Sequence, residues 1–137
     1  MGSRIVVLKS QDAEYEALRQ EIADICHVSG FGEDFRAVLE LTVKEAFVNA
    51  IVHGNRRQAV LPVVVTFVVE DASGSLLVSL RDCGNGFKPE DLPDPTETDF
   101  LQRTSGRGVH IIRRYAEIIE ARRDADGFTL TLRCFPC

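Results

Sequence analysis

The segment from Leu41 to Asn55 constrains the fold of this chain most, because it sets Glu45, Asn49 and His53 at every fourth position of an otherwise apolar helix. Side chains four residues apart share one face of a helix. An apolar stripe runs beside this polar row between positions 35 and 51. The polar row therefore borders a buried surface, where polar atoms need hydrogen-bonding partners.

Length and composition exclude several classes of protein. The 137 residues, 45% of them hydrophobic and 27% charged, predict one globular domain over residues 1–137. A net charge of −5 without any run of basic residues argues against binding to nucleic acid. No stretch approaches the roughly 20 apolar residues of a membrane span, and the start of the chain does not resemble a signal peptide. We expect a cytoplasmic domain, not bound to membranes, with a protein or small-molecule partner.

The four cysteines are scattered, and a chain of this size needs no disulfide framework. We predict reduced thiols. Cys134 and Cys137 have the spacing of a redox motif, but they end the sequence instead of opening a helix, where such motifs lower a thiol pKa. We interpret this pair as incidental.

Hydrophobic periodicity and turn residues predict a run of strands and helices along the chain. Strands are expected at 5–8, 60–70, 75–81, 117–122 and 128–133, and helices at 14–27, from 33 to about 54, and at 109–116. The strands at 60–70 and 75–81 form an antiparallel pair across a short turn. Paired helices followed by grouped strands are typical of an α+β fold.

The row of Glu45 and Asn49 suits phosphoryl transfer. In such a site an amide oxygen can hold Mg²⁺, and a carboxylate one helical turn away can orient an attacking hydroxyl or water. Taken alone, the row is more often a solvated or hydrogen-bonded helix face.

A second pattern is the segment Asp82–Phe87, where a strand ends in an acid followed by Gly84 and Gly86. Glycine permits tight turning and close approach of the backbone to a ligand. The carboxylate could accept a hydrogen bond from an exocyclic amine such as that of adenine. By itself the pattern also fits an ordinary turn at the end of a strand.

The third pattern is Thr104–Val109, a loop of small residues that enters a helix. Free backbone N–H groups at a helix start, together with the helix dipole, form an anion site suited to phosphates. The segment is not a Walker P-loop, since no Gly-Lys-Ser/Thr follows, and alone it equally fits a flexible connection. Between the second and third patterns lies an irregular loop long enough to be functional or mobile.

Taken in order, these patterns resemble the GHKL ATPase superfamily. Residues 45–55 resemble its N box, 82–87 its first glycine box, 106–108 its second and 127–129 its weaker third. The residues within these motifs are most similar to those of the serine-protein-kinase anti-sigma factors of bacterial partner-switching systems. The resemblance implies a two-layer α/β sandwich of the Bergerat type, with a mixed, mostly antiparallel sheet, helices on one face and an ATP lid at about 87–105.

The same resemblance implies a role for each matching residue. Glu45 becomes the general base, Asn49 the Mg²⁺ ligand and Asp82 the reader of adenine. Gly84 and Gly86 would shape the base pocket. The triphosphate would be wrapped by Gly106, Arg107, Gly108 and Val109. Thr129 would place a hydroxyl near the adenine. His53 is interpreted as structural, Arg19 as a partner contact by spacing only, and Cys83 as a variable spacer.

The implied function is an ATP- and Mg²⁺-dependent protein-serine kinase that phosphorylates an anti-sigma-factor antagonist and could also sequester a sigma factor. The family pairs as homodimers, and residues 5–8 offer an exposed strand edge for this. Two alternatives stay open: an ATP-dependent interaction module without catalysis, and the detached catalytic domain of a histidine kinase. The sequence has no phosphoacceptor-histidine helix pair, which disfavours a complete two-component kinase.

Overall fold

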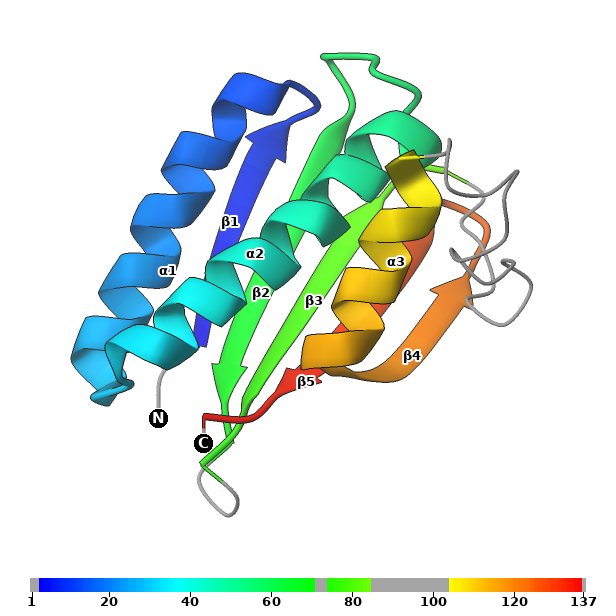
Figure 1. The fold of residues 1–137 in the computed structure, drawn as a ribbon. Helices are drawn as coiled ribbons and strands as arrows, with labels where there is room; N and C mark the ends of the chain where they lie inside the picture. The colour runs from blue at the N-terminus through cyan, green and yellow to red at the C-terminus, as the bar shows by residue number, and fades with distance from the viewer. Residues whose placement is uncertain (1–2, 71–73, 85–103, 137) are drawn as a thin grey trace.

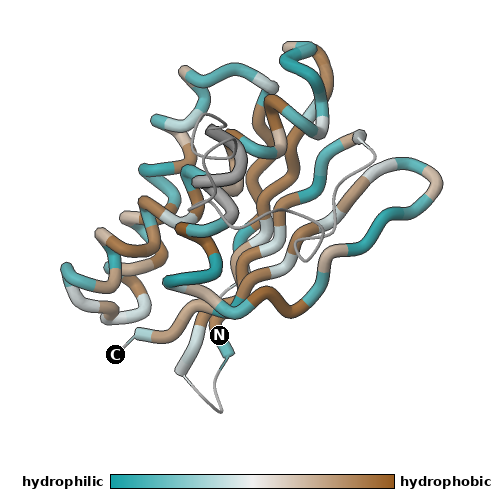
Figure 2. Tube along the Cα trace, turned by 45° about the vertical axis from the view of Figure 1, so that its right-hand side comes forward, coloured by the Kyte–Doolittle hydropathy of each residue, from teal (hydrophilic) through white to brown (hydrophobic). Residues whose placement is uncertain are grey.

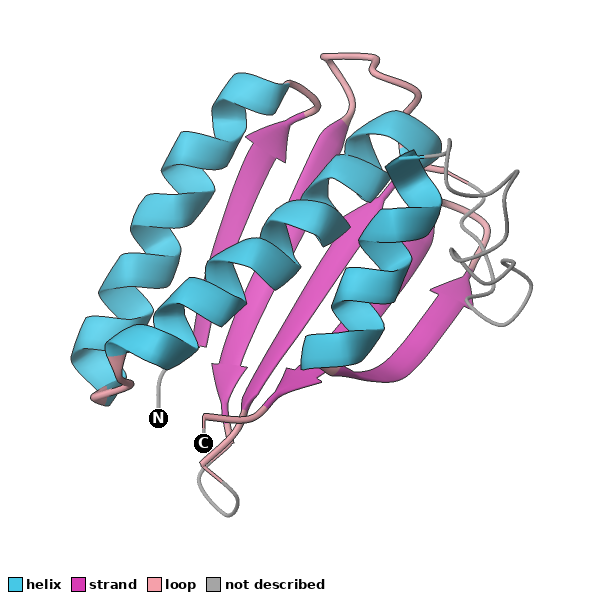
Figure 3. Ribbon diagram, viewed as in Figure 1, coloured by secondary structure: helices cyan, strands magenta, loops and turns pink. Residues whose placement is uncertain are grey.

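The computed structural model describes residues 3–70, 74–84 and 104–136, with the backbone alone for 104–109. Three helices lie over one face of a five-stranded sheet (Figures 1 and 3). The strands are β1 (Ser3–Lys9), β2 (Pro62–Val69), β3 (Leu76–Asp82), β4 (Glu117–Arg123) and β5 (Phe128–Cys134). The helices are α1 (Tyr15–Ser29), α2 (Glu33–Asn49) and α3 (Thr104–Tyr115), with a 3₁₀ turn at Asp12–Glu14 and a π-helical turn at Ala50–Gly54.

The sheet has the order β1-β2-β3-β5-β4, and each of its four neighbouring pairs is antiparallel. This confirms the predicted α+β fold with helices on one face, although the expected mixed sheet is antiparallel throughout the described strands. The reason is the course of α3, which runs back along the sheet from the end of β3 (Figure 1). Strand β4 then runs in the direction of β3, and the β4–β5 hairpin inserts β5 between them.

The core lies between the helices and the sheet, where alternate strand residues are buried. Figure 2 shows the hydrophobic positions gathered along this interface. Strand β2 contributes Val63, Val65 and Phe67, all at 0% exposure, and α2 contributes the equally buried Phe47. The apolar residues that alternate along the strands thus pack against the apolar residues that repeat every 3.6 positions along the helices.

The long helix changes its register where the polar row ends. α2 is α-helical to Asn49 and continues as a π-helical turn to Gly54, which closes when the N–H of Asn55 donates to the carbonyl of Ala50 at 2.8 Å. The predicted end of the helix near position 54 is confirmed. Such wide turns occur frequently at functional sites.

Helix α3 begins at Thr104, five positions before the predicted start at Val109. Thr and Ser are favoured where helices begin, which explains the earlier start. The glycines of the third sequence pattern consequently lie inside the first turns of α3 and not in a loop ahead of it. Most of the predicted ATP lid at 87–105 lies outside the described residues.

Two further expectations can be compared with the described part of the chain. Cys26, Cys83 and Cys134 are free thiols, as predicted, and Cys137 lies outside the described residues. Within the described ranges, no helix is both long enough and apolar enough to cross a membrane.

One charged cluster ties the β2–β3 hairpin to β5. The guanidinium of Arg133 donates to both carboxylate oxygens of Glu70, at 2.8 and 3.1 Å, and the hydroxyl of Ser75 donates to the same carboxylate at 2.6 Å. These hydrogen bonds, with that from Arg133 the stronger, lower the pKa of Glu70 to about 2.

Acid should weaken the fold through this cluster. Because the pKa of Glu70 is about 2 in the folded chain and 4.5 without its partners, its stabilising effect is complete above pH 4.5 and disappears as the pH falls toward 2. We expect Glu70→Gln to flatten the fall in the free energy of unfolding over this range. Urea unfolding at stepped pH measures it, with exposed Glu120→Gln as the control. Equal pH slopes for wild type and Glu70→Gln would contradict the assignment.

Candidate functional site

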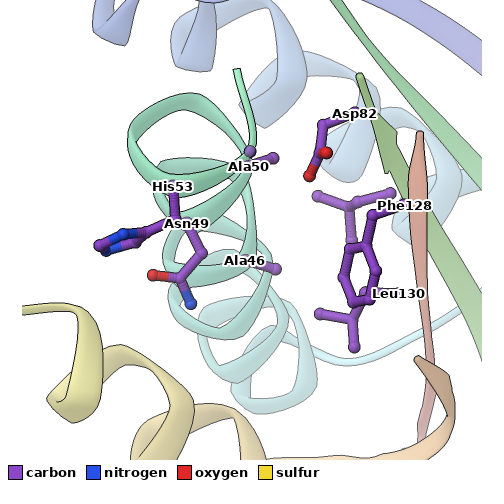
Figure 4. A pocket seen from close by; sticks show the side chains of 9 residues that line it. Ala46, Asn49, Ala50, His53, Asp82, Phe128 and Leu130 are labelled. Atoms are coloured by element: carbon purple, nitrogen blue, oxygen red, sulfur yellow. The ribbon is translucent and has the colours of Figure 1, made fainter. Parts of the chain in front are cut away.

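A small cavity lies between the end of α2 and the facing ends of β3 and β5. Its volume is about 10 Å³, no more than a single water molecule needs. In Figure 4, Ala46 and Ala50 point from the helix toward the sheet side of the cavity. The residues that line it are Ala46, Asn49, Ala50, His53, Gly54, Leu80, Asp82, Phe128 and Leu130.

Asn49 supplies an unsatisfied polar group to this site. Its side chain is 5% exposed, and its Nδ2 atom is buried without a hydrogen-bond partner among the described residues. Buried side-chain amides are nearly always hydrogen-bonded, so an orphan of this kind indicates a place that a bound group or a water completes. Of the polar row formed by Glu45, Asn49 and His53, Asn49 therefore has an amide nitrogen with no hydrogen-bond partner.

Asp82 ends β3 at the opposite wall of the cavity and is also 5% exposed. Its Oδ1 accepts a hydrogen bond from the N–H of Gly84 at 2.7 Å. Burial raises the pKa of this carboxyl, while the Gly84 N–H and the charge of Arg81 lower it in part. A carboxyl in such surroundings is a directional hydrogen-bond acceptor for a polar ligand edge.

Three glycines allow the backbone to close around Asp82. A Cβ atom at Gly54 would collide with the Asp82 carboxylate, one at Gly84 with the backbone of Gly54, and one at Gly127 with the carbonyl of Asp82. Gly84 thus allows the segment after β3 to approach the end of the helix, while its predicted role in shaping a base pocket stays a prediction. The sequence reasoning gave no such role to Gly54 or Gly127, although both lie inside matched motifs, and this was the available signal.

Asn55 is a third residue to which the sequence reasoning assigned no role. It is 1% exposed, and its Nδ2 donates to the Ser10 hydroxyl at 2.8 Å and to the Pro62 carbonyl at 3.0 Å. Its Oδ1 accepts from the N–H of Cys83 at 2.7 Å. In sequence, an Asn after a Gly suggests only the end of a helix. In the structure it holds the segment after β3 against the π-helical turn.

Glu45 and His53 occupy different places relative to the cavity. Glu45 is half-buried one turn before Asn49 and does not line the cavity. His53 is largely exposed at the cavity rim, and its side chain points with that of Asn49 away from the sheet side (Figure 4). Partial burial lowers the pKa of the His53 imidazole, which favours its neutral form.

The structure does not bring Thr129 to this cavity. Strand alternation turns Phe128 and Leu130 toward α2, so Thr129 faces the opposite side of the sheet. There the guanidinium of Arg81 donates to the Thr129 hydroxyl at 3.0 Å and pairs with both oxygens of Asp124 at 2.8 Å. A shift of one position along a strand moves a side chain to the other face of the sheet. The match to the motif did not determine which residue of 127–129 faces α2.

The remaining predicted site residues belong to α3 or lie outside the described residues. Gly106, Arg107, Gly108 and Val109 lie in the first turns of α3, which packs beside α2. Gly86 is outside the described residues. Within the described residues no group of three or more His, Cys, Asp or Glu side chains could hold a metal ion. A single Asn oxygen fits Mg²⁺, which commonly binds few protein groups and completes its shell with phosphates and water.

Comparison with known proteins identifies the family. The model of the histidine kinase-like ATPase domain matches residues 8–134, and the chain belongs to this family. The antiparallel sheet and the layer of helices over one face are therefore the fold of a kinase-like ATPase domain. Among curated proteins, no relative matches the chain.

Solved structures share the fold at low sequence identity. The histidine kinase domain of the blue-light activated histidine kinase from Erythrobacter litoralis EL346 has a TM-score of 0.55 and 21% identity, and covers 91% of this chain. The RsbU and RsbW domains of Rv1364c from Mycobacterium tuberculosis have a TM-score of 0.67 and 17% identity, and cover 98%. This chain spans 60% and 32% of those two structures.

The buried hydrogen bonds of Asn55 lead to a stability prediction. Asn55→Ala leaves the Cys83 N–H and the Pro62 carbonyl without their partner, and we expect it to lower the free energy of unfolding by about 1–3 kcal/mol. Ser10→Ala is the matched control, because it removes the Ser10 hydroxyl and leaves both of those bonds, and we expect a smaller loss. Urea unfolding measures both variants. A larger loss in Ser10→Ala than in Asn55→Ala would show that Asn55 is not the centre of the network.

Proposed function

We propose that this protein is an ATP- and Mg²⁺-dependent protein-serine kinase of the anti-sigma-factor type. The observation that carries the proposal is that one cavity of a histidine kinase-like ATPase domain is lined both by Asn49, whose Nδ2 is buried and unpartnered, and by Asp82, whose carboxyl is buried. One wall offers an amide to a metal and phosphates, and the other offers an acceptor to a base. Both ends of a nucleoside triphosphate have a matching group.

In this proposal Asp82 accepts a hydrogen bond from the exocyclic amine of adenine, and the glycines around it let the base approach the backbone. Asn49 holds Mg²⁺ through its amide oxygen, and the bound ion would neutralise charge on the phosphates. Gly106, Arg107, Gly108 and Val109 would contact the triphosphate at the start of α3, where N–H groups and the helix dipole favour anions. Gly86 and the lid at 87–105 stay predictions.

Glu45 is proposed as the general base. It would take the proton of a substrate serine as the hydroxyl oxygen bonds to the γ-phosphorus, while the bond from that phosphorus to the bridging oxygen breaks and ADP leaves. Its place on α2, one turn from Asn49 and outside the cavity that holds Asp82, suits a residue that meets a second substrate.

The proposed protein substrate is a small anti-sigma-factor antagonist, and a sigma factor is a second proposed partner. The fold likeness to a structure that contains an RsbW domain supports this direction. Arg19, predicted by spacing as a partner contact, is on the exposed face of α1, where its guanidinium pairs with Glu16 at 2.7 Å. It is thus placed where another protein can reach it.

Removing the proposed base should separate binding from transfer. We expect Glu45→Ala to keep ATP affinity within about threefold and to lower phosphate transfer by about 10²–10⁴-fold, since general-base catalysis contributes that much. Transfer is read by intact mass of a candidate antagonist after incubation with Mg-ATP. Glu40→Ala, on the same helix, is the control and should transfer normally. Transfer at the wild-type rate by Glu45→Ala would refute the role of Glu45.

The same incubation distinguishes the two alternative functions. A phosphoserine product survives acid, whereas the phosphohistidine expected from a detached histidine-kinase domain is lost in acid. An interaction module would give no gain of mass, and its affinity for the partner would differ between ATP and ADP.

We further propose a homodimer through β1. This strand forms one edge of the sheet, and its residues Ile5 and Val7 are 70% and 65% exposed on the face opposite the helices. Val68 of β2 adds to the same face with 37% exposure. Apolar side chains beside an open strand edge favour association with another chain.

Charges on this face should prevent pairing. We expect wild type to sediment as a dimer and the double variant Ile5→Lys, Val7→Lys to sediment as a monomer, because two buried ammonium groups in each copy would lose hydration. Val28→Lys, at a position of α1 that is 73% exposed, serves as the control and should stay dimeric. Analytical ultracentrifugation distinguishes these states. A monomeric wild type would disprove this interface.

A further inference from the structure

Phe128 occupies the part of the cavity that faces Asp82. It is the first residue of β5, pairs in register with Asp82 across the β3–β5 ladder and is 4% exposed. Residues paired directly across an antiparallel ladder point to the same face. The aromatic ring and the carboxyl are therefore neighbours by construction of the sheet (Figure 4).

The ring of Phe128 is one of the side chains that leave the cavity small. The wall opposite Phe128 carries the methyl groups of Ala46 and Ala50, and between helix and sheet only about 10 Å³ remains. A purine ring needs far more room than one water molecule. With Phe128 in this position, a base cannot reach the Asp82 carboxyl from within the cavity.

We propose that the ring of Phe128 occupies the base subsite and has to turn aside before a nucleotide base can pair with Asp82, so that this residue sets the affinity of the site for a base. This inference rests on the proposed function, because it concerns the same nucleotide site. The alanines of α2 then leave the base lying between a small-residue wall and Asp82.

The proposal sets the direction in which affinity changes with side-chain size. Binding of a base costs the displacement of the Phe128 ring from its packed position, so shortening this residue should strengthen binding to Mg-ATP. Binding of Mg-tripolyphosphate, which has no base, should not change. A residue with only a structural role would give the opposite result, since losing packed atoms would weaken the fold and the site together.

A graded series tests this. We expect affinity for Mg-ATP, measured by calorimetry, to rise in the order wild type, Phe128→Leu, Phe128→Val, Phe128→Ala, by tenfold or more at the end, with the affinity for Mg-tripolyphosphate constant within twofold. Phe128→Leu keeps an apolar side chain in the core and covers the case in which the alanine variant does not fold. Thermal unfolding confirms the folded state of each variant before binding is measured.

Thr131→Ala is the matched control, because its side chain lies on the other face of the same strand and has no role in the proposed site, and it should bind Mg-ATP as wild type does. If wild type binds Mg-ATP and the folded variants bind it equally or more weakly, the role of Phe128 is refuted and the proposed function stands. If neither wild type nor any folded variant binds Mg-ATP, the proposed function and the role of Phe128 both fall.

Discussion

The close approach of three backbone segments at Asp82 is the constraint on which the site depends. The end of the α2 segment, the segment after β3 and the turn before β5 meet there, each through a glycine that tolerates no Cβ atom. This contact fixes the distance between the end of the helix and the adjoining ends of β3 and β5. Asn49, at the end of α2, and Asp82, at the end of β3, consequently line one cavity although they are far apart in the sequence.

Much of the architecture could be predicted because it follows from local chemistry. Alternating Val and Phe in β2, and the apolar stripe that contains Phe47, are signals that a single sequence displays directly. The site was reached differently, through the order of three motifs that were individually weak. That order led to Asn49, Asp82 and Gly84, which the structure brings together, and the match to the histidine kinase-like ATPase family agrees with it.

What could not be predicted depends on register and on contacts between distant segments. Thr129 and Phe128 differ by one position, and only the pairing of β5 with β3 determines which of them faces α2. Asn55 bonds to residues 45 positions before it and 28 after it, so no local pattern could reveal its role. The start of α3 was misplaced because glycines suggested a loop where Thr104 and Ser105 begin a helix.

The π-helical turn at 50–54 also affects which changes of length the gene can tolerate. A π turn holds one residue more than the α-helical turn it replaces, and successive residues of an α-helix are rotated by about 100°. Deleting one codon here would leave a regular helix but put a residue with a side chain where Gly54 now meets the Asp82 carboxylate. Insertions and deletions in this turn should therefore be selected against more strongly than most substitutions on the exposed face of α2.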